Sequence, residues 1–291
     1  MGGFGAWVDL VDFPMDTDTM EPGSPPSTPP TSARASRAAL PPNVLLLTGG
    51  TGFLGQSIVH NCLRDEATFT KIFLLVRAKR GVSVSERATK LLDDWGALFG
   101  EACVRRKIVL VSATMEGDEL GIEAAALQQI EAETTHVIHA AASVRFDEPA
   151  AVALNVNVTL ARRVVSLAVR CRMLRHHIHV STAYVNPQAT SPRELGLVPL
   201  PPGVDTEALP LDSEADSAGD AAAALYRLHP GHHVNTYTWS KCIAEHVVSR
   251  CAKQNGHQFT IFRPSIIGPA WELPAPGARP GRLPRRQFHV A

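Results

Sequence analysis

The sequence predicts an α/β protein built on a doubly wound parallel sheet. From residue 43 onward, short apolar runs alternate with longer stretches in which apolar residues recur at helical spacing. A glycine-rich turn follows the first apolar run and leads directly into the first helical stretch. Strands that alternate with helices in this way favour a parallel sheet with crossover helices.

Six strands and five helices are expected. The strands are short runs rich in apolar residues, whereas the helices place apolar residues three and four positions apart. The expected strands are Val44–Leu47, Lys71–Val76, Lys107–Val111, His136–His139, Ile178–Ser181 and Phe259–Phe262. The expected helices are Phe53–Arg64, Val84–Leu98, Ile122–Glu131, Ala150–Arg172 and Tyr237–Gln254.

One domain, residues 43–272, is expected between two segments without periodicity. The leader, 1–42, and the tail, 273–291, are rich in proline and are expected to be mostly disordered. A stretch rich in Pro, Ala, Asp and Ser, 187–234, is expected to be a long insertion after the fifth strand. No apolar run of bilayer-spanning length and no secretion signal is recognised.

Composition narrows the classes of function. The 28 basic and 28 acidic side chains cancel, so no overall field draws the chain to nucleic acid. The five cysteines are scattered without any C-x-x-C pair, which argues against a disulfide framework or a zinc cluster and favours a reducing compartment. The histidines at 176–179 and 232–233 have no acidic or cysteine partner in the pattern, so no metal site is expected.

The glycine-rich turn predicts a phosphate-binding site. Gly49 permits the tight turn, Gly52 lets the backbone approach a pyrophosphate, and Gly55 allows close packing of helix and strand. The helix that starts here adds N–H groups and the positive end of its dipole. Such a motif can arise by chance, but a strand before it and a helix after it make it specific. The expected dinucleotide contacts are Thr48, Gly49, Gly50, Thr51, Gly52, Phe53, Leu54 and Gly55.

Cations follow the second strand, where an NAD site has an acidic residue for the ribose. Arg77 is the first of them, and Lys79 and Arg80 come close behind. Because a cation there favours a 2′-phosphate, NADPH is expected rather than NADH, with Arg77 as the contact. The alternative is that these cations are solvated charges at a strand end.

Tyr237 and Lys241 form a Y-x-x-x-K pair at the start of the last expected helix, and this spacing places both on one face. A tyrosine with a pKa of about 10 exchanges protons poorly at neutral pH unless an ammonium stabilises its phenolate. Lys241 is expected to do this and to hold the nicotinamide ribose. The end of the fifth strand offers Ser181 and Thr182 to polarise a substrate carbonyl, at the sheet edge where ligands bind.

The chain resembles the extended short-chain dehydrogenases/reductases, which have a Rossmann-type fold. It has, in the same order, the glycine-rich turn, the Ser-Thr pair at a strand end and the Y-x-x-x-K pair, and the last two resemble the Ser/Thr–Tyr–Lys triad of that family. In that family the hydroxyl aligned with Thr182 is the usual third member, and Ser181 is its neighbour. Val144-Arg145-Phe146-Asp147-Glu148 is similar to the most distinctive signature of fatty acyl-CoA reductases, and the resemblance covers about residues 43–272. It implies further cofactor contacts at His139, Ala140, Ala141, Asn155, Tyr237, Lys241, Pro264, Ser265 and Ile266.

The chain departs from the family pattern in three places. Ser112-Ala113 replaces a Gly-Asp pair after the third strand, which removes a carboxylate expected near the adenine. Val158 replaces a glycine in the motif that Asn155 opens. Family members continue well beyond residue 272 with the rest of the substrate pocket, so the chain is expected to be truncated at its C-terminus.

The resemblance implies NADPH-dependent reduction of long-chain fatty acyl-CoA to fatty alcohol through the aldehyde. Two alternatives stay open: a thioester reductase that acts on carrier-protein-bound acyl chains, and a truncated module that binds the dinucleotide without catalysis. By resemblance alone, an intracellular location is expected, at the cytosolic face of the endoplasmic reticulum or the peroxisome. Peripheral membrane association is left open.

Overall fold

The computed structural model describes residues 42–65, 67–79, 81–186, 196–200, 204, 206, 233 and 235–269. The expected leader, apart from residue 42, and the expected tail lie outside the described residues, as does most of the expected insertion. Arg80, one of the cations after the second strand, also lies outside them.

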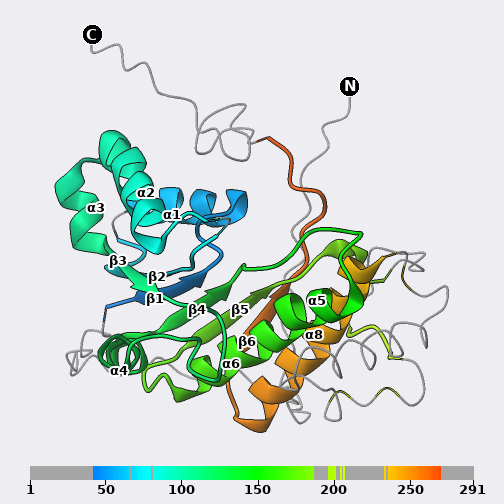
Figure 1. Cartoon of the computed structure of the whole chain (residues 1–291). Helices are drawn as coiled ribbons and strands as arrows, with labels where there is room; N and C mark the ends of the chain where they lie inside the picture. The colour runs from blue at the N-terminus through cyan, green and yellow to red at the C-terminus, as the bar shows by residue number, and fades with distance from the viewer. Residues whose placement is uncertain are drawn as a thin grey trace, which may run out of the picture.

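Six parallel strands form one sheet in the order β3-β2-β1-β4-β5-β6 (Figure 1). The chain order reverses between β1 and β4, and ligands of doubly wound sheets bind at this switch point, beside the carboxyl ends of the strands. The predicted fold class is confirmed. The strands are β1 (Val44–Thr48), β2 (Lys71–Val76), β3 (Ile108–Ser112), β4 (His136–His139), β5 (His176–Val180) and β6 (Phe259–Phe262).

The bounds of β5 differ from the predicted Ile178–Ser181. The strand begins at His176, because His176 pairs with β4 and His177 pairs with both β4 and β6. It ends at Val180, although the Ser181 N–H still donates to the Phe262 carbonyl oxygen at 2.7 Å. Histidine is a weak strand signal in a sequence, whereas pairing with neighbouring strands decides the structure.

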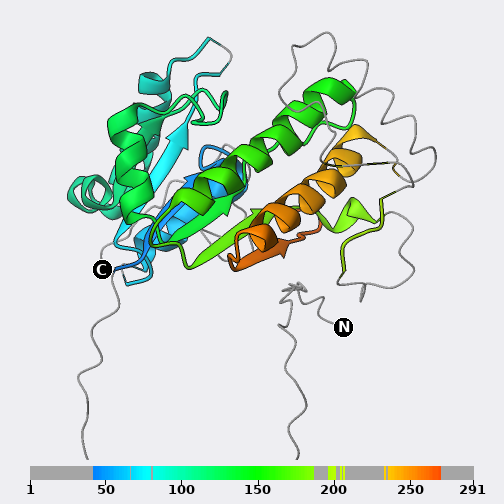
Figure 2. The same cartoon turned by 90° about the horizontal axis from the view of Figure 1, so that it is seen from below.

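Helices cover both faces of the sheet (Figure 1), and Figure 2 shows α6 and α8 side by side across one face. α1, α2 and α3 pack on the face that carries Leu45 and Leu47, α4 and α6 pack on the face that carries Leu46, and α8 packs beside α6. α3 was not predicted, because its seven residues are too few for a periodic pattern. The helices are α1 (Phe53–Arg64), α2 (Val84–Phe99), α3 (Glu101–Lys107), α4 (Ala124–Glu133), α5 (Ala150–Leu154), α6 (Leu160–Arg170) and α8 (Thr236–Gln254).

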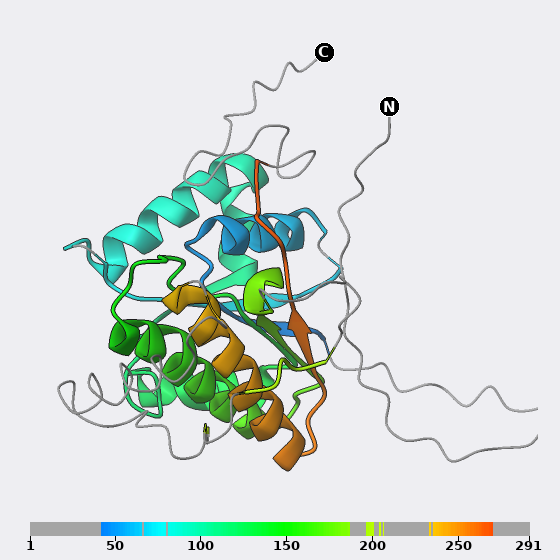
Figure 3. The same cartoon turned by 90° about the vertical axis from the view of Figure 1, so that its right-hand side faces the viewer.

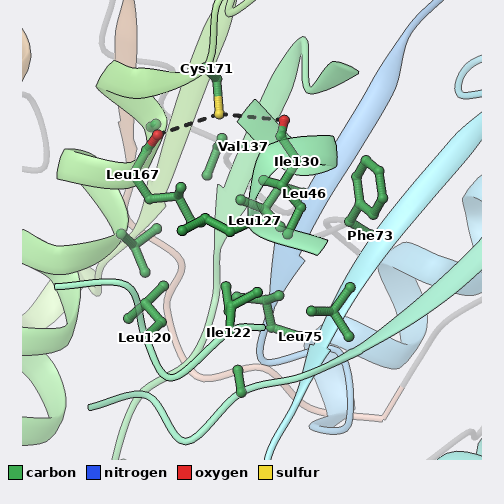
Figure 4. Close-up of a cluster of buried hydrophobic side chains, with 14 of the residues drawn as sticks. Leu46, Phe73, Leu75, Leu120, Ile122, Leu127, Ile130, Val137, Leu167 and Cys171 are labelled. Carbon is green, nitrogen blue, oxygen red and sulfur yellow. Dashed lines mark hydrogen bonds between the residues drawn. The ribbon is translucent and has the colours of Figure 1, made fainter. Parts of the chain in front are cut away.

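The core beneath α4 and α6 is a continuous apolar cluster (Figure 4). Leu46 and Phe73 from the strands meet Ile130 of α4 and Leu167 of α6 there. Cys171 lies in the same cluster, and its thiol donates to the carbonyl oxygen of Leu167 at 3.4 Å. Burial raises the pKa of this thiol to about 12, so Cys171 is a packing residue rather than a nucleophile. All five cysteines of the chain are free.

A π-helical turn, η1 (Asn155–Thr159), joins α5 to α6 without a break. By length and mean hydropathy, the combined helix Ala150–Arg170 would also qualify as a membrane span, which the sequence reasoning did not anticipate. In this structure 61% of the qualifying stretch is buried within the protein. Helices that pack against a central sheet pass the same test, so the result is weak evidence for a membrane span.

Candidate active site

The glycine turn between β1 and α1 packs against the chain that leaves β4. Gly49 has a φ of +76°, and a Cβ there would lie 2.6 Å from the Ala140 carbonyl carbon and from the Ala141 nitrogen. A Cβ on Gly55 would lie 2.2 Å from the Gly49 carbonyl oxygen. Gly49 therefore has the predicted role in the turn. Gly55 packs against the backbone of the glycine turn, whereas the sequence predicted that Gly55 packs the helix against the strand.

The first turn of α1 is accessible to an anionic ligand. Gly52 is the N-cap residue and is exposed, and no side chain of the described residues caps this helix end. Among the described residues, the only atom within 4 Å of a Cβ on Gly52 would be the Gly49 oxygen, at 3.3 Å. Uncapped N–H groups and the helix dipole suit a pyrophosphate. Phe53 and Leu54 are half-buried, so their backbone is the part that fits this role.

Thr48 ties the glycine turn to the end of β4. Its hydroxyl lies 2.7 Å from His139 Nδ1 and accepts the Ala141 N–H at 3.2 Å. The His139 side chain is buried, and burial followed by the charge of Lys241 holds its pKa well below the usual range. The imidazole is therefore neutral. Of the three predicted cofactor contacts His139, Ala140 and Ala141, the backbone of Ala140 and Ala141 faces the glycine turn.

Arg87 of α2 lies between the glycine turn and the end of β2. Its guanidinium donates to the Thr51 hydroxyl at 2.7 Å and to the Arg77 carbonyl oxygen. Burial, and then the positive charge of Arg77, lowers the pKa of Arg87. Two guanidinium groups thus lie near the position predicted for the ribose. The sequence predicted Arg77 but not Arg87, because the role of Arg87 comes from its contacts with Thr51 and Arg77 on other segments.

Tyr237 and Thr182 meet at the carboxyl end of β5. Asn235 caps α8 with its side chain, and Tyr237 lies in the first turn of this helix. The side chain of Tyr237 lies near that of Thr182, which itself caps the 3-10 turn η2 (Ala183–Val185). Burial raises the pKa of Tyr237, and the nearby Thr182 side chain counteracts this rise. The structure therefore brings together two residues that lie far apart in the sequence and were predicted to act together.

Lys241 lies one helical turn after Tyr237 and is buried. Its Nζ donates to the Val180 carbonyl oxygen at 2.5 Å, which places the amine at the same sheet edge. Burial lowers the pKa of Lys241 to about 8, and the charge of Glu245 counteracts this shift. Arg263 clamps Glu245 through both carboxylate oxygens, at 2.8 and 2.6 Å. At pH 7 the lysine is still mostly protonated, as stabilisation of a phenolate requires.

The remaining predicted residues near Thr182 lie on two adjacent segments. Ser181 is buried, and its hydroxyl has no hydrogen-bond partner among the described residues. The Pro264 carbonyl oxygen accepts the Ala183 N–H at 2.9 Å, so the segment after β6 runs beside η2 (Figure 3). Ser265 and Ile266 follow Pro264 and are exposed. The structure thus brings the Pro264–Ile266 segment next to the triad.

Asn155 does not contribute to this cluster in the structure. Its side chain is exposed, whereas Asn157, two residues later, is buried. The Asn157 amide nitrogen donates to the Ser240 hydroxyl at 2.9 Å, next to Lys241. Both residues lie in the π turn η1, and the role of Asn155 as a cofactor contact stays a prediction.

A glycine turn at the switch point of a parallel sheet, together with a Thr–Tyr–Lys cluster at the same edge, defines a Rossmann-type protein of the extended short-chain dehydrogenase/reductase class. The chain belongs to the Male sterility protein family of NAD-binding domains, whose sequence profile matches residues 47–285. Its cofactor is accordingly a nicotinamide dinucleotide.

Curated relatives include fatty acyl-CoA reductases. The chain is 33% identical over 243 residues to fatty acyl-CoA reductase 1 of Homo sapiens and 32% identical over 244 residues to that of Xenopus laevis. Each match covers 80% of this chain and 45% of the relative. The chain therefore spans a little less than half the length of the curated relatives it matches.

Solved structures with the same fold include reductase domains. The terminal R domain from the myxalamid PKS-NRPS biosynthetic pathway superposes with a TM-score of 0.55 at 28% identity, covering 79% of this chain and 50% of that one. A thiolation-reductase di-domain from an archaeal non-ribosomal peptide synthetase superposes with a TM-score of 0.54 at 21% identity, covering 79% of this chain and 42% of that one. The second likeness concerns the fold alone.

Proposed function

We propose that this chain is the dinucleotide-binding and catalytic part of an enzyme that reduces long-chain fatty acyl-CoA to fatty alcohol through the aldehyde. The observation that carries the proposal is that Tyr237 and Thr182 lie together at the end of β5, with buried Lys241 one helical turn away and bonded to the Val180 carbonyl oxygen. The identity to fatty acyl-CoA reductases, set out above, supports the substrate. The cofactor supplies a hydride when it is bound.

Each side chain of the cluster has a defined task in this proposal. Tyr237 gives its proton to the carbonyl oxygen of the thioester, and Thr182 holds that oxygen by a hydrogen bond. Lys241 stabilises the phenolate that remains on Tyr237. The resulting hemithioacetal loses the thiol to give the aldehyde. A second hydride and a second proton from Tyr237, after it has been reprotonated, then complete the alcohol.

We further propose NADPH as the preferred cofactor. The 2′-phosphate that distinguishes NADPH from NADH is dianionic or nearly so, and it suits a site with two guanidinium groups. Arg77 and Arg87 supply them from β2's end and from α2. Arg87 is also hydrogen-bonded to Thr51, so the same side chain links 2′-phosphate recognition to the glycine turn.

Carrier-protein-bound acyl chains are the second candidate substrate. The 28% identity to the R domain of the myxalamid pathway favours this reading, since that domain belongs to a PKS-NRPS pathway. The chemistry at the thioester is the same in both cases, and only the group beyond the sulfur differs. A third candidate, dinucleotide binding without turnover, predicts a measurable cofactor affinity and no oxidation.

The experiment that separates these candidates follows NADPH oxidation by the purified chain with palmitoyl-CoA and, in parallel, with a palmitoyl-loaded carrier protein. We expect oxidation with palmitoyl-CoA that falls at least about 100-fold in Tyr237→Phe, because general acid catalysis contributes roughly that much. Thr182→Val is expected to lose activity as well. Thr70→Val serves as the matched control, since Thr70 is exposed and lies just before β2, at the opposite edge of the sheet. NADPH binding without NADPH oxidation would refute the proposed enzymatic activity.

A further inference from the structure

The loop Ser143–Glu148 follows β4 and contains the distinctive Val144–Glu148 signature, yet none of the roles assigned above uses it. We infer that Phe146 of this loop is a specificity-determining residue, against which the hydrocarbon adjoining the reacting thioester packs. The inference rests on the proposed function for its substrate. Phe146 is thereby added to the substrate-binding part of the site, because it contacts Tyr237.

Phe146 is exposed although it lies beside the proton donor. Its side chain is 65% exposed, and its ring centroid is 5.8 Å from that of Tyr237, with 36° between the ring planes. Val144, two residues earlier, is 69% exposed. Single exposed apolar residues are common on protein surfaces. An exposed aromatic ring in contact with a catalytic side chain is a different case, because any acyl group that reaches Tyr237 must pass close to it.

The loop is held in place by hydrogen bonds to the helix that carries Tyr237. The Thr236 hydroxyl donates to the Glu148 carbonyl oxygen at 2.8 Å and lies 3.3 Å from that of Phe146. The Ser143 hydroxyl donates to the Glu148 carboxylate. The middle and the end of the loop are therefore tied to the first residue of α8, next to Tyr237. An exposed ring on such a tethered loop keeps its place without help from the core.

Asn157 fixes the start of the same loop. Its Oδ1 accepts the Ser143 N–H at 2.9 Å, and its Nδ2 donates to the Ser143 carbonyl oxygen at 3.2 Å. The same Nδ2 donates to Ser240, the residue before Lys241. One buried amide thus connects the loop to the catalytic helix. It lies in the π turn η1, and π turns inside helices often mark functional sites.

The neighbourhood of the loop suits a hydrocarbon better than a phosphate. Arg145 is paired with Asp147 at 3.1 Å, so its charge is already neutralised within the loop. Tyr184 and Ile266 lie on the segments that flank Thr182 and are 45% and 82% exposed. Exposed apolar side chains therefore lie on three segments next to the Tyr237–Thr182 pair: the loop, η2 and the segment after β6. Covering them with an alkyl chain removes apolar surface from water.

The test compares Phe146→Ala with Met173→Ala in the 291-residue chain. Met173 is also an exposed apolar residue, at 41%, but it lies in the turn before β5, away from this sheet edge. We expect Phe146→Ala to lower kcat/KM for palmitoyl-CoA by about 10-fold, mainly through KM, because part of a phenylalanine's burial is lost. Phe146→Leu should recover most of the loss, and Met173→Ala should match the wild type.

Two further measurements separate this inference from the proposed function. Palmitoyl-CoA binding is measured calorimetrically in the Tyr237→Phe background, where Phe146→Ala should weaken affinity by a similar factor even if no turnover is seen. Palmitoyl-pantetheine should show the same factor, since the contact is to the hydrocarbon and not to the nucleotide of CoA. Equal affinity and equal KM with and without the Phe146 ring would overturn the inference. So would an equal effect of Met173→Ala, or loss of NADPH affinity in Phe146→Ala.

Discussion

Replacing Gly49 by alanine should destabilise the protein far more than the same change at Gly81. The two glycines have nearly the same φ, +76° and +78°, so a β-carbon meets the same backbone penalty of roughly 1–2 kcal/mol at either position. They differ in their surroundings. A Cβ on Gly81 would have no atom of the described residues within 4 Å, whereas one on Gly49 would lie 2.6 Å from two backbone atoms of the chain after β4.

The extra cost at Gly49 can be worked out from these contacts. Ordinary contacts of a Cβ begin at 3.4 Å, so the turn and the chain after β4 would have to separate by about 0.8 Å, the difference between 3.4 and 2.6 Å. That movement would strain two hydrogen bonds, from Ala140 N–H to the Thr48 carbonyl oxygen at 3.3 Å and from Ala141 N–H to the Thr48 hydroxyl at 3.2 Å. Each contributes about 1 kcal/mol. Gly49→Ala should therefore cost about 2 kcal/mol more than Gly81→Ala.

Urea unfolding of the two variants, followed by far-UV circular dichroism, measures this difference directly. Dinucleotide affinity should fall in Gly49→Ala and stay unchanged in Gly81→Ala, because only the first turn is part of the phosphate site. Equal free energies of unfolding would refute the reasoning. They would mean that the turn does not pack against the backbone after β4, and the placement of the glycine turn at the switch point would lose its support.

Two other predictions concern charges at the site. Arg87→Gln should raise the Kd for NADPH by about 10-fold or more and leave the Kd for NADH unchanged, since a charge-assisted hydrogen bond contributes about 1.5–3 kcal/mol. Fluorescence titration with both cofactors measures the two Kd values. An equal loss of affinity for NADPH and NADH would contradict the prediction. Glu245→Gln leaves Arg263 buried without its carboxylate, which should cost about 3–5 kcal/mol in thermal or urea unfolding. Because Glu245 raises the pKa of Lys241, that pKa should fall below about 8, and the corresponding limb of the pH–rate profile should move to lower pH. A limb that stays in place would exclude this coupling.

The fold could be predicted from the sequence because its signals are local. Apolar periodicity identified all six strands and placed Phe53–Arg64 within its observed bounds. Along β5, His177 and His179 lie two residues apart and are both buried, as the two-residue period of a strand requires. The missed element, α3, has seven residues, and its start depends on Gly100 with a φ of +85°. The conformation of a single glycine does not show in the spacing of apolar residues along the sequence.

The grouping of Thr182, Tyr237 and Lys241 at one sheet edge was predictable for a related reason. The spacing of Tyr237 and Lys241 fixes their common face as soon as a helix forms, and a Ser-Thr pair at a strand end lies at the ligand-binding edge of any parallel sheet. Arg87 and Glu245 gave no such signal. Each acquires its role from a partner on another element, Thr51 for Arg87 and Arg263 for Glu245. A charge in a helix of the sequence looks the same whether or not such a partner exists.

Asn157 shows how an irregular turn creates a contact that a motif read on a regular helix does not predict. A motif read on a regular helix assigns each side chain a direction that advances by about 100° per residue. The π turn from Asn155 to Thr159 contains an extra residue and so rotates the later side chains relative to that expectation. Asn157 therefore points to the catalytic helix and bonds to Ser240, while Asn155 faces solvent. Since the same amide holds Ser143, the irregularity of the helix is what joins the Phe146 loop to the Tyr237–Lys241 pair.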